Sequence, residues 1–157
     1  MRRADVPRVL SLWRDLMANG QRMDPRWDVK DDAHEWMAAW IRDVFLVSKP
    51  YPHAHVYEED GEVQAFVSGF PDSGSPVLNE PPAMRIGDVY VAPSVRRRGV
   101  GRRLVDAQVQ AAHRAGCTNI IVETLVKDER AVAFWRGIGF DPMRIQLRRA
   151  VHATDPT

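Results

Sequence analysis

The sequence predicts a mixed α/β domain in which one sheet packs against helices. Two patterns lead to this prediction: apolar residues recur every three or four positions in some segments and alternate with polar residues in others. The chain has 157 residues, enough for one domain with a buried core, and it carries no repeat or internal linker. We therefore expect a single domain over residues 1–150, followed by a frayed tail over residues 151–157.

Two helices are expected first along the chain. Residues 5–20 begin with a capping aspartate, carry Pro7 in the first turn and end at Gly20. A second helical pattern covers residues 31–50 and is ended by its final proline. Residues 21–30 form an irregular polar connector between the two helices.

Strands are expected from residue 53, where the apolar period changes to two. Residues 53–70 predict a hairpin of two strands joined by a tight turn at Asp60 and Gly61. Residues 71–82 are rich in turn-forming residues and predict a loop. Residues 84–93 predict a third strand that a proline ends.

Helices and strands alternate in the last third of the chain. Apolar residues at helical spacing predict helices over residues 99–116 and 128–139, each ended by a glycine. Residues 118–126 and 140–151 predict the last two strands.

Composition excludes several classes of protein. The formal net charge is +1, so the overall charge does not indicate a nucleic acid or anionic membrane partner. The lone cysteine, Cys117, excludes an internal disulfide, favours a reducing compartment and is interpreted as a small buried hydrophobe. No segment is apolar over the length that a membrane span or secretory signal requires. We expect a soluble, cytoplasmic protein.

The sequence VRRRGVGRRL over residues 95–104 lies between the third strand and the next helix. Gly99 and Gly101 allow a turn in which backbone N–H groups and the helix start face an anion. The segment is not a P-loop because no Gly-Lys-Ser/Thr follows, and Leu104 replaces the third glycine of the dinucleotide fingerprint. A solvated basic turn is the alternative, but the arginines precede the helix rather than lying along it. We therefore predict a pyrophosphate-binding loop.

The loop resembles the acetyl-coenzyme A loop of the GNAT superfamily of N-acetyltransferases. The signature of that loop is Gln or Arg, two residues, Gly, one residue, then Gly or Ala, and residues 96–101 fit every fixed position. The resemblance extends over residues 54–147, and the two leading helices agree with the variable acceptor-binding region of the family. It implies a largely antiparallel sheet flanked by helices, with a splay between the fourth and fifth family strands.

The resemblance also implies acetyl-coenzyme A as the acetyl donor. Backbone amides of the loop would bind its pyrophosphate, and main-chain groups of the preceding strand would bind the pantetheine arm at the splay. The residues assigned to these two roles are Val89, Tyr90, Val91, Arg96, Arg97, Arg98, Gly99, Val100, Gly101 and Arg102.

Three further residues are assigned to the cofactor site, two of them departing from the family pattern. The family often has asparagine three residues before the alanine of its fourth helix, and here Asp128 precedes Ala131. Trp135 stands where many members carry a tyrosine that protonates the leaving thiolate, and indole cannot supply that proton. Trp135 either packs against the thioester end of the cofactor or belongs to the core.

Amine attack on a thioester requires a base, because an ordinary ammonium with a pKa of about 10.4 is protonated at neutral pH. Asp88 and Glu123 are the candidate bases, since each is a carboxylate within an otherwise apolar strand pattern. The alternatives are a turn or hydrogen-bonding role for Asp88 and a solvent-facing position for Glu123. Tyr90 or a water is the candidate acid, although Tyr90 could equally be a sheet-facing aromatic.

The histidines do not predict a metal site. His53 and His55 alternate on one strand and could line the cleft, but no third ligand follows at metal-binding spacing. His34 and His113 are expected on helix surfaces.

Four tryptophans lie within the first forty residues. We expect most of them in the core, with the alternative that Trp27 or Trp36 faces the acceptor. In that case the substrate has an apolar or flat portion. The full set is Trp13, Trp27, Trp36 and Trp40.

The leading functional hypothesis is transfer of an acetyl group from acetyl-coenzyme A to a primary amine by direct attack in a ternary complex. The acceptor is a polyamine, an amino sugar, an amino acid or a protein terminus. Alternatives are a different acyl donor or a hydroxyl acceptor, a coenzyme A-binding regulator without catalysis, and a nucleic-acid-binding module using Arg96–Arg98. We expect no nucleic acid or membrane partner and allow for a homodimer.

Overall fold

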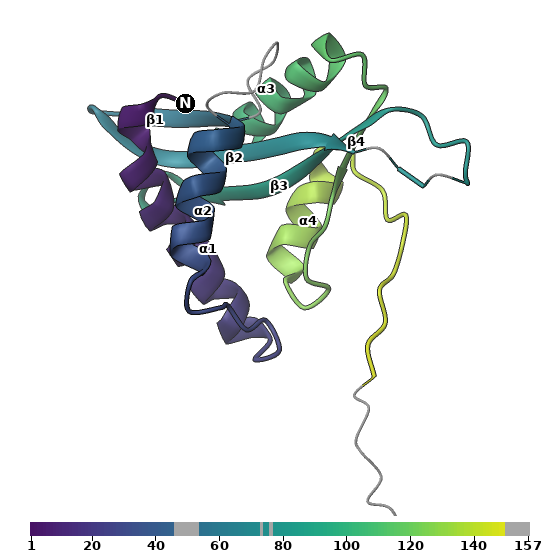
Figure 1. Cartoon of the computed structure of the whole chain (residues 1–157), viewed down its shortest axis with the longest axis horizontal. Coiled ribbons are helices and arrows are strands. Elements are labelled where there is room, and N and C mark those ends of the chain that lie inside the picture. The colour runs from purple at the N-terminus through teal and green to yellow at the C-terminus, as the bar shows by residue number, and fades with distance from the viewer. Residues whose placement is uncertain (46–53, 73, 76, 150–157) are drawn as a thin grey trace, which may run out of the picture.

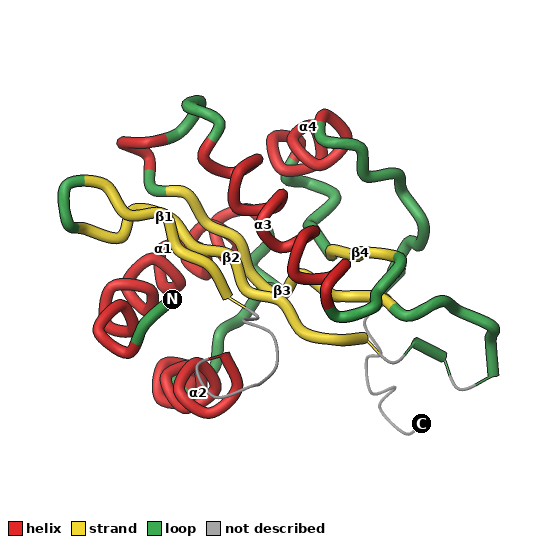
Figure 2. Tube along the Cα trace, turned by 90° about the horizontal axis from the view of Figure 1, so that it is seen from above, coloured by secondary structure: helices red, strands yellow, loops and turns green. Residues whose placement is uncertain are grey.

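The computed structural model describes residues 1–45, 54–72, 74–75 and 77–149 (Figure 1). A four-stranded sheet forms the middle layer, with α1 and α2 on one face and α3 and α4 on the other (Figure 2). The helices and strands are α1 (Val6–Met23), α2 (Ala33–Trp40), β1 (Ala54–Glu59), β2 (Glu62–Asp72), β3 (Ala83–Val91), α3 (Val100–Arg114), β4 (Asn119–Val122) and α4 (Glu129–Gly137). Short helical turns are η1 (Arg3–Asp5), η2 (Ile41–Phe45) and η3 (Pro93–Val95). The predicted mixed α/β fold is confirmed.

The first two helices pack their apolar faces on the sheet. In α1, Val9, Leu12 and Trp13 are buried at the spacing expected for one helix face. In α2, Met37 is buried, and Ile41 continues its face into the π-helical turn η2. The remainder of the second predicted helix falls within residues 46–53, outside the described part of the chain.

The predicted hairpin is confirmed, and its strands set the register of the sheet. The turn residues Asp60 and Gly61 have φ of 51° and 76°, the left-handed backbone that a tight two-residue hairpin turn requires. The strand order is β1-β2-β3-β4, with antiparallel pairing up to β3 and parallel pairing between β3 and β4.

Strands β3 and β4 separate after a short paired stretch. Residues Ala83–Ile86 of β3 pair with Asn119–Val122 of β4, where β4 ends. Strand β3 continues to Val91 and pairs there only with β2 among the residues described. The expected splay between these strands is therefore present.

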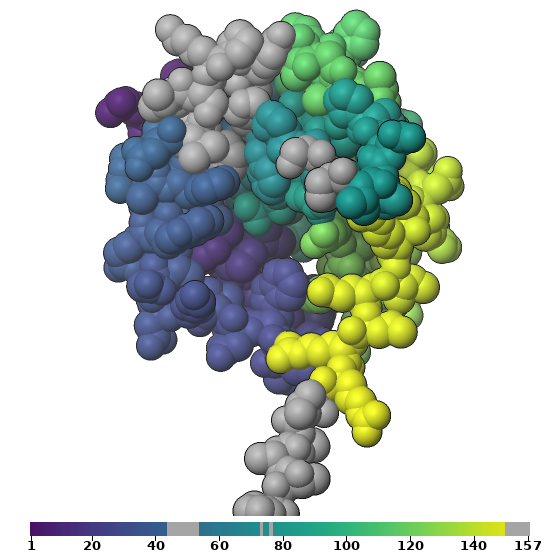
Figure 3. All heavy atoms as spheres, turned by 45° about the vertical axis from the view of Figure 1, so that its right-hand side comes forward, coloured from purple at the N-terminus to yellow at the C-terminus, as the bar shows by residue number. Residues whose placement is uncertain are grey.

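The prediction of a strand over residues 140–151 is wrong for the described residues 140–149, which have no regular secondary structure. Arg144 forms an ion pair with Glu80 in the loop between β2 and β3, which directs the segment toward that loop. The segment leaves the body of the molecule (Figure 1) and runs along its outside (Figure 3). The segment pairs with no strand in the described part of the chain. Its alternating apolar side chains, Met143, Ile145 and Leu147, are 70–89% exposed.

No helix among the described residues is long and apolar enough to cross a membrane.

The core is continuous, formed by α1 and α2 against one face of the sheet and by α3 against the other. Trp135 of α4 joins this core. The residues that connect the end of β3 to the start of α3, Arg96–Gly99, are exposed at the surface.

Candidate functional site

The connection from β3 to α3 contains two residues with left-handed backbone. Arg97 has φ 60° and Gly99 has φ 76°, and Gly99 is the residue immediately before α3. A Cβ at Gly99 would meet no atom within 4 Å, so the space beside the loop is open. The left-handed positions turn the chain sharply, so α3 begins directly after the loop.

The loop leaves a series of backbone donors without acceptors. The N–H of Arg96 donates to Pro93 and that of Arg103 donates to Gly99, at 3.4 and 3.1 Å. Between them, the N–H groups of residues 97–102 have no acceptor in the described part of the chain. Free N–H groups at a helix start carry partial positive charge and bind anions. The loop therefore has N–H donors for an anion, and its binding of a pyrophosphate stays a prediction.

Gly101 allows α4 to approach the first turn of α3. A Cβ at this position would lie 3.3 Å from two ring atoms of Phe134 and 3.7 Å from Cγ2 of Val91. Such contacts are tight enough to require movement of the Phe134 ring. The absence of a side chain at Gly101 therefore lets α3, α4 and β3 meet beside the splay.

The loop arginines divide into paired and unpaired side chains. Arg96 Nε donates to the Val91 carbonyl at 2.8 Å, and its guanidinium lies over the Tyr90 ring. Arg98 forms an ion pair with Glu59. Arg97 and Arg102 are exposed and make no side-chain hydrogen bond or ion pair with any residue that the structure describes. The unpaired arginines are thus the ones free to meet an anionic ligand.

The edge of β3 offers main-chain groups to the splay. The Ala92 N–H donates to the Gln64 carbonyl of β2 at 2.8 Å. Alternate residues of an antiparallel strand bond to the same neighbour, so Val91 and Val89 direct their main-chain groups away from β2. The Arg96 side chain accordingly reaches the Val91 carbonyl from that side.

Asp88 lies on β3 at the edge of a small hollow of about 10 Å³. Its N–H donates to Ser68 Oγ at 3.1 Å. Burial raises the pKa of Asp88 to about 6, although the Ser68 hydroxyl and the Trp13 indole act in the opposite direction. The Trp13 N–H is buried and has no acceptor at normal hydrogen-bond geometry in the described chain. The other residues lining the hollow are Met1, Val9, Met37, Ile41, Ala54 and Phe66.

A family model described as Acetyltransferase (GNAT) family matches residues 10–140. The chain belongs to the GNAT acetyltransferase family. Comparison with curated proteins gives no match.

Solved structures show the same fold. The chain is 18% identical to AAC(6')-Iy in complex with a bisubstrate analogue, CoA-S-monomethyl-acetylneamine, over 97% of this chain and 95% of that one, with a TM-score of 0.70. For a mutant of the BH1408 protein from Bacillus halodurans, the identity is 13% over 97% of each chain and the TM-score is 0.77. The aminoglycoside acetyltransferase meta-AAC0020 from an uncultured soil metagenomic sample, in complex with trehalose, is 17% identical to this chain. The match covers 97% of this chain and 93% of that chain, and the TM-score is 0.66.

The other candidate base of this GNAT domain, Glu123, has a different environment from Asp88. Its side chain is 84% exposed and pairs with Arg85 at 2.5 Å. Arg85 also pairs with Asp72 at 2.5 Å, so the two carboxylates share one guanidinium. Glu123 is therefore a solvated ion-pair member, while Asp88 is enclosed by apolar side chains.

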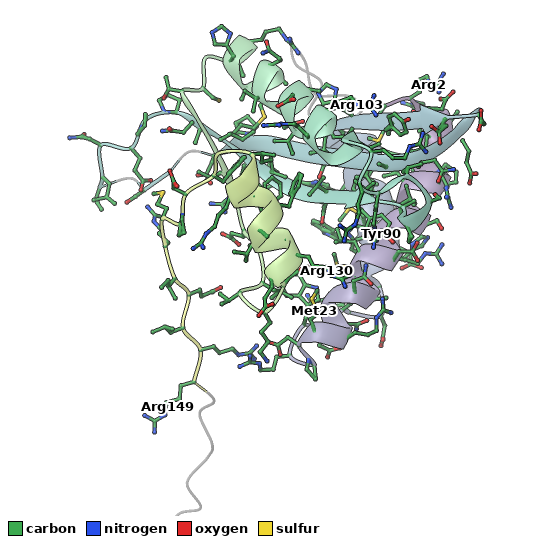
Figure 4. All side chains as sticks on the ribbon, turned by 180° about the vertical axis from the view of Figure 1, so that it is seen from behind. Arg2, Met23, Tyr90, Arg103, Arg130 and Arg149 are labelled. Atoms are coloured by element: carbon green, nitrogen blue, oxygen red, sulfur yellow. The ribbon has the colours of Figure 1, made fainter. Side chains whose placement is uncertain are left out.

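Tyr90 is buried and faces the same side of β3 as Asp88, two residues away. It pairs opposite Phe66 of β2, and Figure 4 shows it beside α1. The structure thus brings Asp88 and Tyr90 together on the face of β3 that α1 and α2 cover.

The α4 residues of the GNAT pattern have structural roles in this chain. Asp128 caps the helix, its Oδ1 accepting from the Ala131 N–H at 3.0 Å. Trp135 is 6% exposed, and its ring lies edge-on to those of Phe134 and Phe140 with centroid distances of 5.0 Å. These contacts favour the core interpretation of Trp135.

The tryptophans of the N-terminal region are less buried than predicted. Only Trp13 of the four lies fully in the core, whereas Trp27 is 44% exposed and Trp36 is 58% exposed. The Trp36 ring stacks on that of Trp40 at 5.1 Å between centroids. The expectation that most of these residues are core was wrong for Trp27, which lies in the connector between α1 and α2, and for Trp36, which lies on an uncovered part of α2.

The remaining polar candidates do not form a cluster. His55 is partly buried on β1, where desolvation lowers its pKa, and His53 lies outside the described residues. No group of three potential metal ligands occurs in the ranges the structure describes. Cys117 is partly exposed rather than fully buried.

Sequence reasoning missed the partners that surround the loop and the base. Glu59 and Tyr57 on β1 contact arginines of the loop and of α3, and Ser68 contacts Asp88. Glu59 and Arg98 are separated by 39 residues, and no local motif links them. The only available signal was the alternation of β1, which places Tyr57 and Glu59 on one face.

Proposed function

We propose that this GNAT domain transfers an acetyl group from acetyl-coenzyme A to a primary amine by direct attack in a ternary complex. The observation that carries the proposal is the series of free N–H groups over residues 97–102, at the start of α3 and beside the unpaired edge of β3. A diphosphate bound at these N–H groups would place the rest of the acetyl-coenzyme A molecule beside that edge.

The residues at the splay fit acetyl-coenzyme A. Free N–H groups of the loop would bind the diphosphate, and the exposed Arg97 and Arg102 would add positive charge. The N–H of Val91 and both main-chain groups of Val89 would hydrogen-bond the pantetheine amides as an added strand does. Bound in this way, the donor presents its acetyl thioester to acceptors near the middle of β3.

Asp88 is the proposed general base. Its pKa of about 6 leaves it ionised at neutral pH, yet close enough to the working pH for efficient proton transfer. The carboxylate accepts the proton of the acceptor ammonium, directly or through a water, and the neutral amine then attacks the thioester carbon. Glu123 is the less suitable base, because its exposed carboxylate already pairs with Arg85.

Tyr90 is the proposed acid for the leaving thiolate. It lies on the same face of β3 as Asp88, and its phenol is the titratable donor nearest along the strand. The demand on this acid is modest, since a thiol has a pKa of about 8.5 and leaves well as a thiolate. We assign Asp128 and Ala131 to the end of α4 that borders the pantetheine arm, and Trp135 to the packing beneath it.

An amino sugar is the acceptor class we propose to test first. Two proteins of similar structure are the aminoglycoside N-acetyltransferase AAC(6')-Iy, in complex with an acetylneamine bisubstrate analogue, and the aminoglycoside acetyltransferase meta-AAC0020, in complex with sisomicin. In this chain the exposed Trp36 and Trp27 on the α1 and α2 side offer flat apolar surfaces against which a sugar ring can pack.

The test measures release of free thiol from acetyl-coenzyme A with a panel of amino sugars, polyamines, amino acids and peptides, together with calorimetric binding of coenzyme A. We expect binding and turnover with at least one amine, and loss of both in Gly99→Asp, which places a carboxylate at the anion site. Binding without turnover on any acceptor would favour a coenzyme A-binding regulator. No binding of coenzyme A would refute the proposal.

A further inference from the structure

One arginine of the loop is held by a carboxylate on the distant hairpin. Arg98 Nη1 and Nη2 donate to the two oxygens of Glu59 at 2.9 and 2.5 Å, a bidentate pair. The Tyr57 hydroxyl donates to Glu59 Oε1 at 3.0 Å. The Glu59 carboxylate therefore receives three hydrogen bonds and joins β1 to the loop.

The same strand face also contacts the start of α3. The Arg103 guanidinium lies 5.2 Å from the centroid of the Tyr57 ring and donates to the Arg98 carbonyl at 3.5 Å. Figure 4 shows Arg103 at this end of α3. Tyr57 and Glu59, two residues apart on β1, thus hold both the middle of the loop and the first turn of the helix after it.

The loop needs such support because its own backbone provides little. Two of its residues have left-handed backbone, and the N–H groups of residues 97–102 make no hydrogen bond within the described chain. A loop of this kind loses conformational freedom when it binds a ligand, unless other contacts already fix it. The contacts with Glu59 fix it in advance.

The ion pair also determines which arginines are available to a ligand. The hydrogen bond from Arg98 is the main cause that lowers the pKa of Glu59, so the carboxylate stays ionised at neutral pH and balances the Arg98 charge. Arg96 is engaged with Val91. Only Arg97 and Arg102 among the arginines of residues 96–102 have side chains without a partner in the described structure.

We infer that Glu59 is a positioning residue for donor binding: it fixes the Arg98 side chain, so that the loop presents its N–H groups to the diphosphate and the Arg98 guanidinium does not contact the phosphates. This inference rests on the proposed function. It assigns to the β1-β2 hairpin a part in binding acetyl-coenzyme A although no hairpin residue touches the donor.

The first experiment compares Glu59→Gln with Glu58→Gln in the full chain. Glu58 is the matched control, because it is the adjacent hairpin glutamate and pairs with an arginine, Arg2, at the same 2.5 Å on the opposite face of the sheet. We expect Glu59→Gln to raise the KM and the calorimetric Kd for acetyl-coenzyme A about fivefold to tenfold. The kcat, the acceptor KM and all parameters of Glu58→Gln should remain as in the wild type.

The second experiment asks whether Arg98 acts through Glu59. Arg98→Gln alone and the double variant Glu59→Gln/Arg98→Gln should match Glu59→Gln, since each removes the same contact. The swapped pair Glu59→Arg/Arg98→Glu should recover most of the affinity. If Glu59→Gln fails to fold, Tyr57→Phe removes one donor to the carboxylate and should raise the KM for the donor by a smaller factor.

Two results would overturn the inference. Tighter donor binding by Glu59→Gln would mean that Arg98 is a phosphate ligand which Glu59 holds back. Equal donor affinity in Glu59→Gln and Glu58→Gln would mean that the pair only supports the fold. A wild-type chain that fails to bind coenzyme A would instead refute the proposed function, and a melting temperature measured on each variant separates folding losses from binding losses.

Discussion

The main-chain N–H of Asp88 donates to the Ser68 hydroxyl across the two central strands, at 3.1 Å. This contact holds the backbone of Asp88 against β2, and Asp88 lines the hollow between the sheet and the first two helices. In the same environment, burial raises the pKa of Asp88 to about 6. An enclosed carboxylate that titrates near neutrality suits proton transfer and carries a cost in stability, and each property can be measured.

Replacing Asp88 by Asn should lower kcat by about 10²-fold to 10⁴-fold, the usual loss when a general base is removed. In the wild type, kcat/KM should fall as the pH drops below about 6, because the protonated carboxyl cannot accept a proton. Asp88→Asn should lose this inflection while keeping its affinity for coenzyme A. If Glu123→Gln shows the larger loss of kcat, the base is Glu123 instead.

The same substitution should stabilise the protein at pH 7.5. The folded-state pKa of Asp88, about 6, lies above the ordinary value of 3.8, so the folded state binds the proton more tightly than the unfolded state does. The free energy of unfolding therefore falls as the pH rises from about 4 to about 6, by up to about 3 kcal/mol at 1.36 kcal/mol per unit. Asp88→Asn removes this slope, which urea unfolding at several pH values measures. An unchanged slope would show that Asp88 is solvated.

Packing around Trp135 predicts that this residue acts on stability and not on donor binding. Trp135→Phe deletes part of a buried ring between Phe134 and Phe140 and should cost about 1–3 kcal/mol. The KM for acetyl-coenzyme A should stay within twofold of the wild type, because the ring packs in the core. A twofold change in KM corresponds to about 0.4 kcal/mol. A large rise in this KM with little change in unfolding free energy would place Trp135 against the donor.

Much of the fold followed from local pattern. The hairpin turn at Asp60 and Gly61 and the glycines at the start of α3 demand particular backbone geometry, so their sequence signals are specific. The glycine-containing turn before α3 was predictable for the same reason, and its binding of a phosphate stays a prediction. The splay of β3 and β4 followed from the family resemblance carried by that turn.

The contacts around the site were not predictable, because they join segments that no local rule connects. The ion pair of Glu59 and Arg98 depends on the position of the β1-β2 hairpin relative to the loop. The enclosure of Asp88 depends on α1 and α2 covering that part of β3, whereas Glu123, with a similar sequence context, ends in solvent. Alternation shows which residues share a face and leaves open what covers the face.

The segment after α4 provides the sharpest case, because its alternation predicts a strand that the structure does not contain. Met143, Ile145 and Leu147 are exposed, so replacing all three by Ser removes almost no buried surface. Each change should alter the free energy of unfolding by no more than about 0.5 kcal/mol. The measurement is urea unfolding at low and high protein concentration. A loss of several kcal/mol at both concentrations would mean that these side chains pack within the chain, and a loss confined to high concentration would mean that they pack between chains.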